Sequence, residues 1–234
     1  MICFVDYRTT DAEIHALKNF GLSPIKVPKT NLVYESINGH VDIQLNILNK
    51  SERTIIVQKD IEKSFLEELK NNNIKYVFSK NSLKSHYPED IILNGLITKD
   101  YFVHNTKYTD TNLLKEVQNK KIINIPQGYT KCSILPIKNN VFITNDTTIY
   151  KALSSINDID ILYIPYGDIL LPSMNYGFIG GIGGMLNSNT LGIFGDFKEY
   201  KYGDIVMNFL NKHKINVLSL SPGKLVDRGS IFVL

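Results

Sequence analysis

The stretch Gln127-Gly-Tyr-Thr-Lys-Cys-Ser-Ile134 opens the structural unit from which we predict the fold. It follows the turn residue Pro126 and leads into residues 132–137, whose apolar character is typical of a short strand. Three further elements are expected after it, namely a strand at 141–144, a helix at 148–156 and a strand at 160–164. The unit therefore has the order strand, strand, helix, strand, and Cys132 begins its first strand.

The same order recurs on both sides of this stretch. Residues 229–234 predict a first strand that no second strand or helix follows, and residues 2–5, 10–20 and 24–27 supply the missing strand, helix and strand. In the N-terminal helix, Thr10-Asp-Ala-Glu13 forms a capping box. A fifth unit is therefore split between the two chain ends. The remaining three units are expected at 38–48, 53–57, 60–69 and 75–78; at 90–98, 101–104, 109–119 and 121–125; and at 176–186, 191–194, 203–213 and 216–220.

Pairing of the two chain ends in one sheet would close a ring of repeated units. Five units over this chain average about 47 residues each, a period typical of propellers and arrays. We therefore predict an α/β fold, a five-bladed pseudosymmetric β/α propeller in which the N- and C-terminal strands close the split blade. The chain would form a single domain of residues 1–234. The alternative is an open α/β sandwich without true repeats.

Composition narrows the functional classes. Hydrophobic residues make up 43% and charged residues 21% of the chain, as in ordinary globular proteins. A net charge of +3 without a basic tract argues against nucleic acid as a partner, and no apolar run reaches the roughly 20 residues that span a membrane. Cys3 and Cys132 make no disulfide framework, and the N-terminus shows no signal peptide. We expect a cytoplasmic protein without nucleic-acid or membrane partners; the sequence does not indicate an oligomeric state.

Three short motifs fall on predicted first strands: Asp227-Arg-Gly-Ser230, Gly39-His40-Val41-Asp42 and Gly128-Tyr-Thr-Lys-Cys132. They resemble the Glu-Gly-Gly-Asp-like, His-x-Asp-like and Gly-x-x-Cys-like motifs of the pentein superfamily of guanidino-group-modifying enzymes. That superfamily includes arginine and agmatine deiminases, dimethylargininase and amidinotransferases. Its acidic motif comes first in the chain and its cysteine near the C-terminus, so this chain resembles a circular permutation of the family pattern. Residues 127–132 and 177–181 are also similar to a bacterial family of uncharacterised proteins.

The resemblance implies a catalytic set. Cys132 would attack an amidino carbon as a thiolate, His40 would act as general acid and then general base, and Asp227 would complete the set. Lys131 or a nearby imidazolium would lower the pKa of Cys132. The residues expected to bind the substrate, through charge-assisted hydrogen bonds or close backbone approach, are Asp42, Gln44, Lys131, Gly180 and Gly181.

The position of three of these residues rests on strand geometry. Side chains alternate between the two faces of a strand, so His40, Asp42 and Gln44 would point together toward the channel. No group of cysteine, histidine and acidic residues has the spacing of a metal site, so no metal or cofactor is expected. The partner would be a small-molecule substrate.

Each motif has a simpler structural explanation. Cys132 could be a small core residue, the His40–Asp42 pair a surface contact, and Asp227 a turn residue before Gly229. The glycine-rich residues 177–184 contain no acid where family deiminases grip their substrate, which argues against an arginine-like substrate. A structural bulge there is favoured over a phosphate-binding loop.

Two functional hypotheses therefore follow from the sequence. In the first, the protein is a cysteine-dependent hydrolase or amidinotransferase that acts on a small C–N compound through a covalent thio-intermediate. In the second, it is a non-catalytic binding protein on the same fold, as is the ribosome anti-association factor. The presence of Cys132, His40 and Asp227 on the expected blades favours the enzyme.

Overall fold

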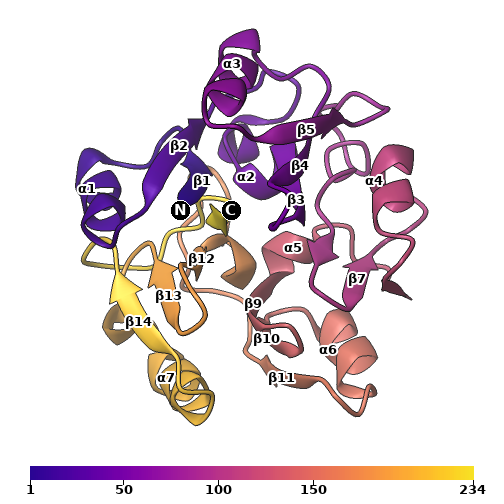
Figure 1. Cartoon of the computed structure of the whole chain (residues 1–234). Coiled ribbons are helices and arrows are strands. Elements are labelled where there is room, and N and C mark those ends of the chain that lie inside the picture. The colour runs from indigo at the N-terminus through magenta and orange to yellow at the C-terminus, as the bar shows by residue number, and fades with distance from the viewer.

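The repeated unit predicted from the sequence is the unit from which the structure is built. The computed structural model describes residues 1–234 and contains five sheets of three strands each. In every sheet the first strand pairs antiparallel with the second, and the second pairs parallel with the third. The five sheets lie around a common centre, and the longer helices lie toward the outside (Figure 1).

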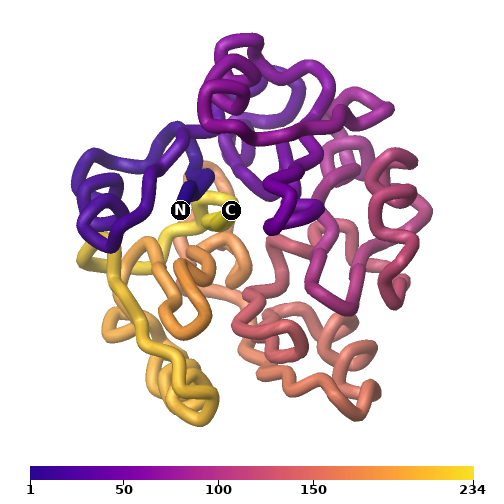
Figure 2. Tube along the Cα trace, in the orientation of Figure 1, coloured from indigo at the N-terminus to yellow at the C-terminus, as the bar shows by residue number.

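The split unit is confirmed. Strand β15 (Phe232–Val233) pairs antiparallel with β1 (Ile2–Asp6), which pairs parallel with β2 (Ser23–Val27). Helix α1 (Asp11–Asn19) connects β1 to β2 and begins with the predicted capping box between Thr10 and Glu13. The two chain ends therefore lie side by side near the centre of the molecule, where Figure 2 shows them together.

The other four units follow the predicted order. The second unit contains η1 (Glu35–Ile37), α2 (Val41–Gln44), β3 (Leu45–Asn49), β4 (Thr54–Val57), α3 (Lys63–Asn71) and β5 (Lys75–Phe78). The third contains β6 (Leu96–Ile97), β7 (Tyr101–His104), α4 (Thr111–Glu116) and β8 (Lys121–Asn124). The fourth contains α5 (Thr130–Ser133), β9 (Ile134–Lys138), β10 (Val141–Thr144), α6 (Thr147–Ser154) and β11 (Asp160–Tyr163). The fifth contains η2 (Ile179–Gly181), β12 (Gly183–Met185), β13 (Thr190–Ile193), η3 (Phe197–Glu199), α7 (Gly203–Lys212) and β14 (Asn216–Ser219).

The middle strand of each sheet supplies much of the core. Strands β7 and β10 are buried along their whole length, as expected for strands covered on both faces. Four fully buried phenylalanines come from the middle strands or the residue directly after one, and they are Phe4, Phe102, Phe142 and Phe194. The apolar contacts form several clusters that join neighbouring units rather than one central core. None of the helices has the length and apolar character needed to span a membrane.

The first strands begin later than predicted. The segments 38–48, 132–137 and 176–186 each contain a helical turn before the strand, namely α2, α5 and η2. The strand prediction for His40, Asp42 and Gln44 is therefore wrong. Their alternating pattern indicates a strand with one polar face, but all residues of the turn are buried, so no face is left to solvent. The polar side chains instead bond to one another and to the backbone of other units.

Candidate active site

Cys132 lies in the helical turn α5, directly before β9, rather than at the start of the strand. Its side chain is only 2% exposed and has polar neighbours. The Asn94 side-chain amide donates a hydrogen bond to Sγ at 3.1 Å, and the Cys132 backbone N–H donates to Asn94 Oδ1 at 3.3 Å. The thiol donates to Asp42 Oδ1 at 3.4 Å. Cys132 is therefore held in a defined orientation by two other units of the fold.

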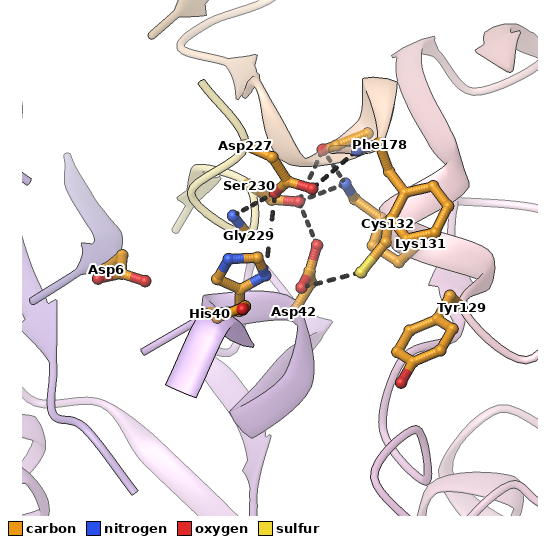
Figure 3. Close-up of polar contacts among 12 residues, drawn as sticks. Asp6, His40, Asp42, Tyr129, Lys131, Cys132, Phe178, Asp227, Gly229 and Ser230 are labelled. Carbon is orange, nitrogen blue, oxygen red and sulfur yellow. Dashed lines mark hydrogen bonds and ion pairs between the residues drawn. The ribbon is translucent and has the colours of Figure 1, made fainter. Parts of the chain in front are cut away.

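His40 and Asp227 come from two further turns that meet beside Cys132 (Figure 3). The His40 ring is fully buried, and neither of its nitrogens has a hydrogen-bond partner. Its Nδ1 lies 3.9 Å from Asp227 Oδ1. Asp227 accepts hydrogen bonds from the Gly229 N–H at 3.0 Å and the Phe178 N–H at 2.8 Å, so it also has the turn role that the sequence allowed. An orphaned buried imidazole is uncommon and indicates a position reserved for a ligand.

The three predicted catalytic residues line one cavity of about 160 Å³. Most of its other lining side chains are apolar or aromatic, among them Tyr34, Tyr129, Tyr176 and Phe178. A larger cavity of about 760 Å³ lies along the first strands of the sheets, but no cysteine or histidine lines it. The smaller cavity is therefore where nucleophilic chemistry can occur.

Asp42 and Lys131 lie behind Cys132 and do not line its cavity. The Lys131 ammonium donates to Ser230 Oγ at 2.7 Å and to the Gly180 carbonyl at 3.1 Å, and Ser230 Oγ donates to Asp42 Oδ2 at 2.6 Å. This buried chain connects the lysine charge to the carboxylate that accepts from the thiol. The structure thus gives both residues a supporting position rather than the substrate contact that the sequence predicts.

The other predicted substrate-binding residues do not line the cavity either. The Gln44 amide donates to the backbone carbonyls of Pro28 and Asn38 at 2.6 and 3.0 Å, which fixes the loop before α2. A Cβ on Gly180 would lie 2.1 Å from the Lys131 carbonyl oxygen, and one on Gly181 would lie 1.8 Å from Asp227 Oδ1. These glycines allow η2 to pack against the site, which agrees with the structural alternative for the glycine-rich stretch.

Burial and negative charge determine the protonation of the thiol. Burial raises the pKa of Cys132 well above its usual value, and the charges of Asp42 and Asp227 raise it further. The Asn94 hydrogen bond and the Lys131 charge lower it, but they do not outweigh the other effects. The expectation that Lys131 activates the thiol is therefore correct in sign and wrong in the net result. Burial also raises the pKa of Asp227, and it lowers the pKa of Lys131.

This electrostatic balance predicts how Cys132 reacts with a neutral reagent. The thiolate is the reactive form, so alkylation by iodoacetamide should accelerate steadily between about pH 6 and about pH 10 without a plateau near neutrality. Mass spectrometry after timed labelling measures the rate at each pH. Cys3 is an internal reference, because burial raises its pKa to about 12. A rate that levels off near pH 7 would contradict the predicted electrostatic effect.

The site also brings three candidate metal ligands together. A ring nitrogen of His40, a carboxylate oxygen of Asp42 and the sulfur of Cys132 lie within 4.8 Å of one another, the only such group in the chain. Imidazole, carboxylate and thiolate are all ligand types that zinc accepts. Sequence spacing does not predict this group because the residues come from turns in different units.

Sequence reasoning missed several residues of the site, and the repeat contains a signal for some of them. Asn94, Cys132, Gly181 and Ser230 each lie two residues before the first strand of their unit, at β6, β9, β12 and β15. All four turn toward the centre of the fold. Equivalent positions in a pseudosymmetric structure occupy equivalent places, so alignment of the units on Cys132 would have identified Asn94 and Ser230. The aromatic residues Tyr34, Tyr129 and Phe178 have no comparable signal.

A family model with the description "Family of unknown function (DUF6873)" matches residues 4–232. No curated protein sequence matches the chain.

Several solved structures resemble the chain over almost its whole length. SxtG, an amidinotransferase from Microseira wollei in the saxitoxin biosynthetic pathway, has a TM-score of 0.58 at 10% identity and covers 97% of this chain and 89% of its own. The inosamine-phosphate amidinotransferase StrB1 from Streptomyces griseus has 0.56 at 13%, covering 94% and 77%. DDAH (dimethylarginine dimethylaminohydrolase) from Pseudomonas aeruginosa has 0.53 at 11%, covering 94% and 91%. These likenesses confirm the predicted pentein fold.

Proposed function

Because the chain belongs to DUF6873, a family of unknown function, and shares its fold with amidinotransferases and DDAH, we propose that it is a cysteine-dependent amidino-group hydrolase or transferase. Its substrate is a small C–N compound that forms a covalent bond with Cys132. The observation that supports this most is the meeting of Cys132, His40 and Asp227 in one buried cavity, with both ring nitrogens of His40 unpartnered.

The residues of the cavity suit a two-step reaction. The Cys132 sulfur adds to the amidino carbon, and its proton passes to His40. The leaving nitrogen takes that proton from His40 and departs as an amine, which leaves the amidino group on sulfur. Water then gives a proton to His40 and adds to the same carbon, the thiolate departs, and His40 returns the proton to sulfur. With an amine in place of water, the second step transfers the group instead of hydrolysing it.

A cationic substrate would itself activate the thiol. The charges of Asp42 and Asp227 raise the pKa of Cys132 when no cation is bound beside it. An amidinium ion in the cavity opposes these charges and therefore lowers the thiol pKa. Nucleophile formation is thus linked to the arrival of a substrate with the correct charge, and the thiol is protected at other times.

We also propose that residues 1–234 form one β/α-propeller domain, with its split blade closed by β1 and β15, and that the protein is cytoplasmic. Pairing of the terminal strands supports the ring. Two unpaired buried cysteines, Cys3 and Cys132, are consistent with a reducing compartment.

The test compares two alkylating reagents of the same shape, 2-chloroacetamidine and 2-chloroacetamide. Near neutral pH the cationic amidine should label Cys132 at least about tenfold faster than the neutral amide, because a charged hydrogen bond contributes about 1.5–3 kcal/mol. Mass spectrometry locates and times the adduct. Asp227→Asn should reduce the rate with the amidine but not with the amide. His40→Ala should keep the preference, since chloride leaves without a proton. Equal, slow labelling by both reagents would instead favour a non-catalytic binding protein.

A further inference from the structure

The volume of the catalytic cavity limits the size of the substrate. At about 160 Å³ it is similar to the apolar cavities of about 150 Å³ that hold one benzene molecule. A guanidinium or amidinium group occupies much of that space. Only a short substituent remains possible without movement of the surrounding side chains.

Aromatic rings form much of the cavity lining. The rings of Tyr129 and Phe178 are stacked, with centroids 6.0 Å apart and planes at 22°, and Tyr176 meets Phe178 edge-on at 6.3 Å. Tyr34 lies beside them, with its hydroxyl 3.2 Å from that of Tyr129. The Tyr129 hydroxyl donates to the buried carboxylate of Asp90, so a negative group also lies behind this ring. Aromatic faces attract cations, and most strongly where water is excluded.

The charged residues near the cavity favour a cation and disfavour a carboxylate. Asp227 is the only acidic residue among those that line it, and no lysine or arginine does. The nearest guanidinium, of Arg228, bonds to Glu13 and to the Arg8 carbonyl. The ammonium of Lys131 faces Ser230 and Gly180. A carboxylate on the ligand would therefore be buried without a fixed positive partner, which is costly.

We propose that the substrate of this site is a small alkyl-substituted guanidinium or amidinium cation without a carboxylate, held by Asp227 and the aromatic side chains of Tyr34, Tyr129, Tyr176 and Phe178. This substrate class rests on the proposed function. It excludes amino acids such as arginine, since their carboxylate has no partner in the cavity and their length exceeds it.

Two guanidines that differ in one group test the exclusion of carboxylates. Ethylguanidine and guanidinoacetate are alike except that a carboxylate replaces the methyl group in the second. Isothermal titration of the Cys132→Ser protein, which retains the cavity, should give ethylguanidine an affinity at least about tenfold higher than that of guanidinoacetate or arginine. Guanidinoacetate or arginine binding as tightly as ethylguanidine, or no binding of any of them, would overturn the substrate class.

A pair of tyrosine variants tests the aromatic side chains. Tyr176 lines the cavity, is 39% exposed and makes no hydrogen bond, so Tyr176→Leu should fold and should weaken ethylguanidine binding about threefold. Tyr150 is similarly exposed at 37% but lies on α6, outside the cavity, and Tyr150→Leu should leave the affinity unchanged. Equal affinities for the two variants would contradict the cation–aromatic contact.

These measurements separate the substrate class from the proposed function. Selective binding of ethylguanidine to Cys132→Ser, without preferential labelling of wild-type Cys132 by chloroacetamidine, would overturn the enzyme and support the ligand class. Preferential labelling together with equal binding of ethylguanidine and guanidinoacetate would support the enzyme and overturn the ligand class.

Discussion

Cys132→Ser is expected to reduce amine and ammonia release from ethylguanidine by at least about 10³-fold, because the loss of a covalent nucleophile removes the reaction path and not only part of its rate. The serine hydroxyl can accept from the Asn94 amide and donate to Asp42, as the thiol does, so the fold should be retained. The measurement combines amine release over time with a thermal melt of the same sample. Acid-quenched wild-type protein should show an amidino adduct on Cys132 that the variant lacks.

The other cysteine provides the matched control. Cys3 lies in β1, is fully buried and packs in an apolar cluster with Val5 and Leu17. Cys3→Ala should therefore lower stability slightly and leave turnover per folded molecule unchanged. If Cys132→Ser kept the wild-type rate, or if Cys3→Ala lost it, Cys132 would not be the nucleophile.

Gly180→Ala is expected to cause the largest loss of stability among single-methyl additions near the site. Its Cβ would lie 2.1 Å from the Lys131 carbonyl oxygen, 2.4 Å from that of Ile134 and 2.5 Å from that of Cys132. All three atoms belong to the backbone, so η2 and α5 must separate. We expect the free energy of unfolding to fall by about 3 kcal/mol, and Tm by about 6–12 °C, as measured by urea titration and a thermal melt.

A second glycine separates this close approach from the general effect of adding a methyl group. Gly21 ends α1 with a φ of +93°, and no atom lies within 4 Å of a Cβ built there. Gly21→Ala should therefore lose only the backbone strain, about 1 kcal/mol. The same or a larger loss at Gly21 than at Gly180 would show that η2 does not pack against α5 as closely as the structure indicates.

The sequence alone determines the repeated unit and its split. Apolar runs of strand length, separated by an amphipathic helix, depend on local periodicity, and so does the capping box at Thr10 and Glu13. The chain ends could be paired because each lacks the part of the unit that the other holds. The same repeat assigns Cys132, His40 and Asp227 to different units that meet at the centre. These features could be predicted since neighbours along the chain specify them.

The tertiary structure decides how the site works. The helical turn at His40 and Asp42 forms because every side of it is buried, and no short-range pattern contains that information. Likewise, the raised pKa of Cys132 is the sum of burial and of charges on Asp42, Asp227 and Lys131, which lie in three separate parts of the sequence. Desolvation and Coulomb forces depend on distances in space. The sequence therefore indicates which residues meet, whereas only the packed structure decides which of them face the substrate and which hold their protons.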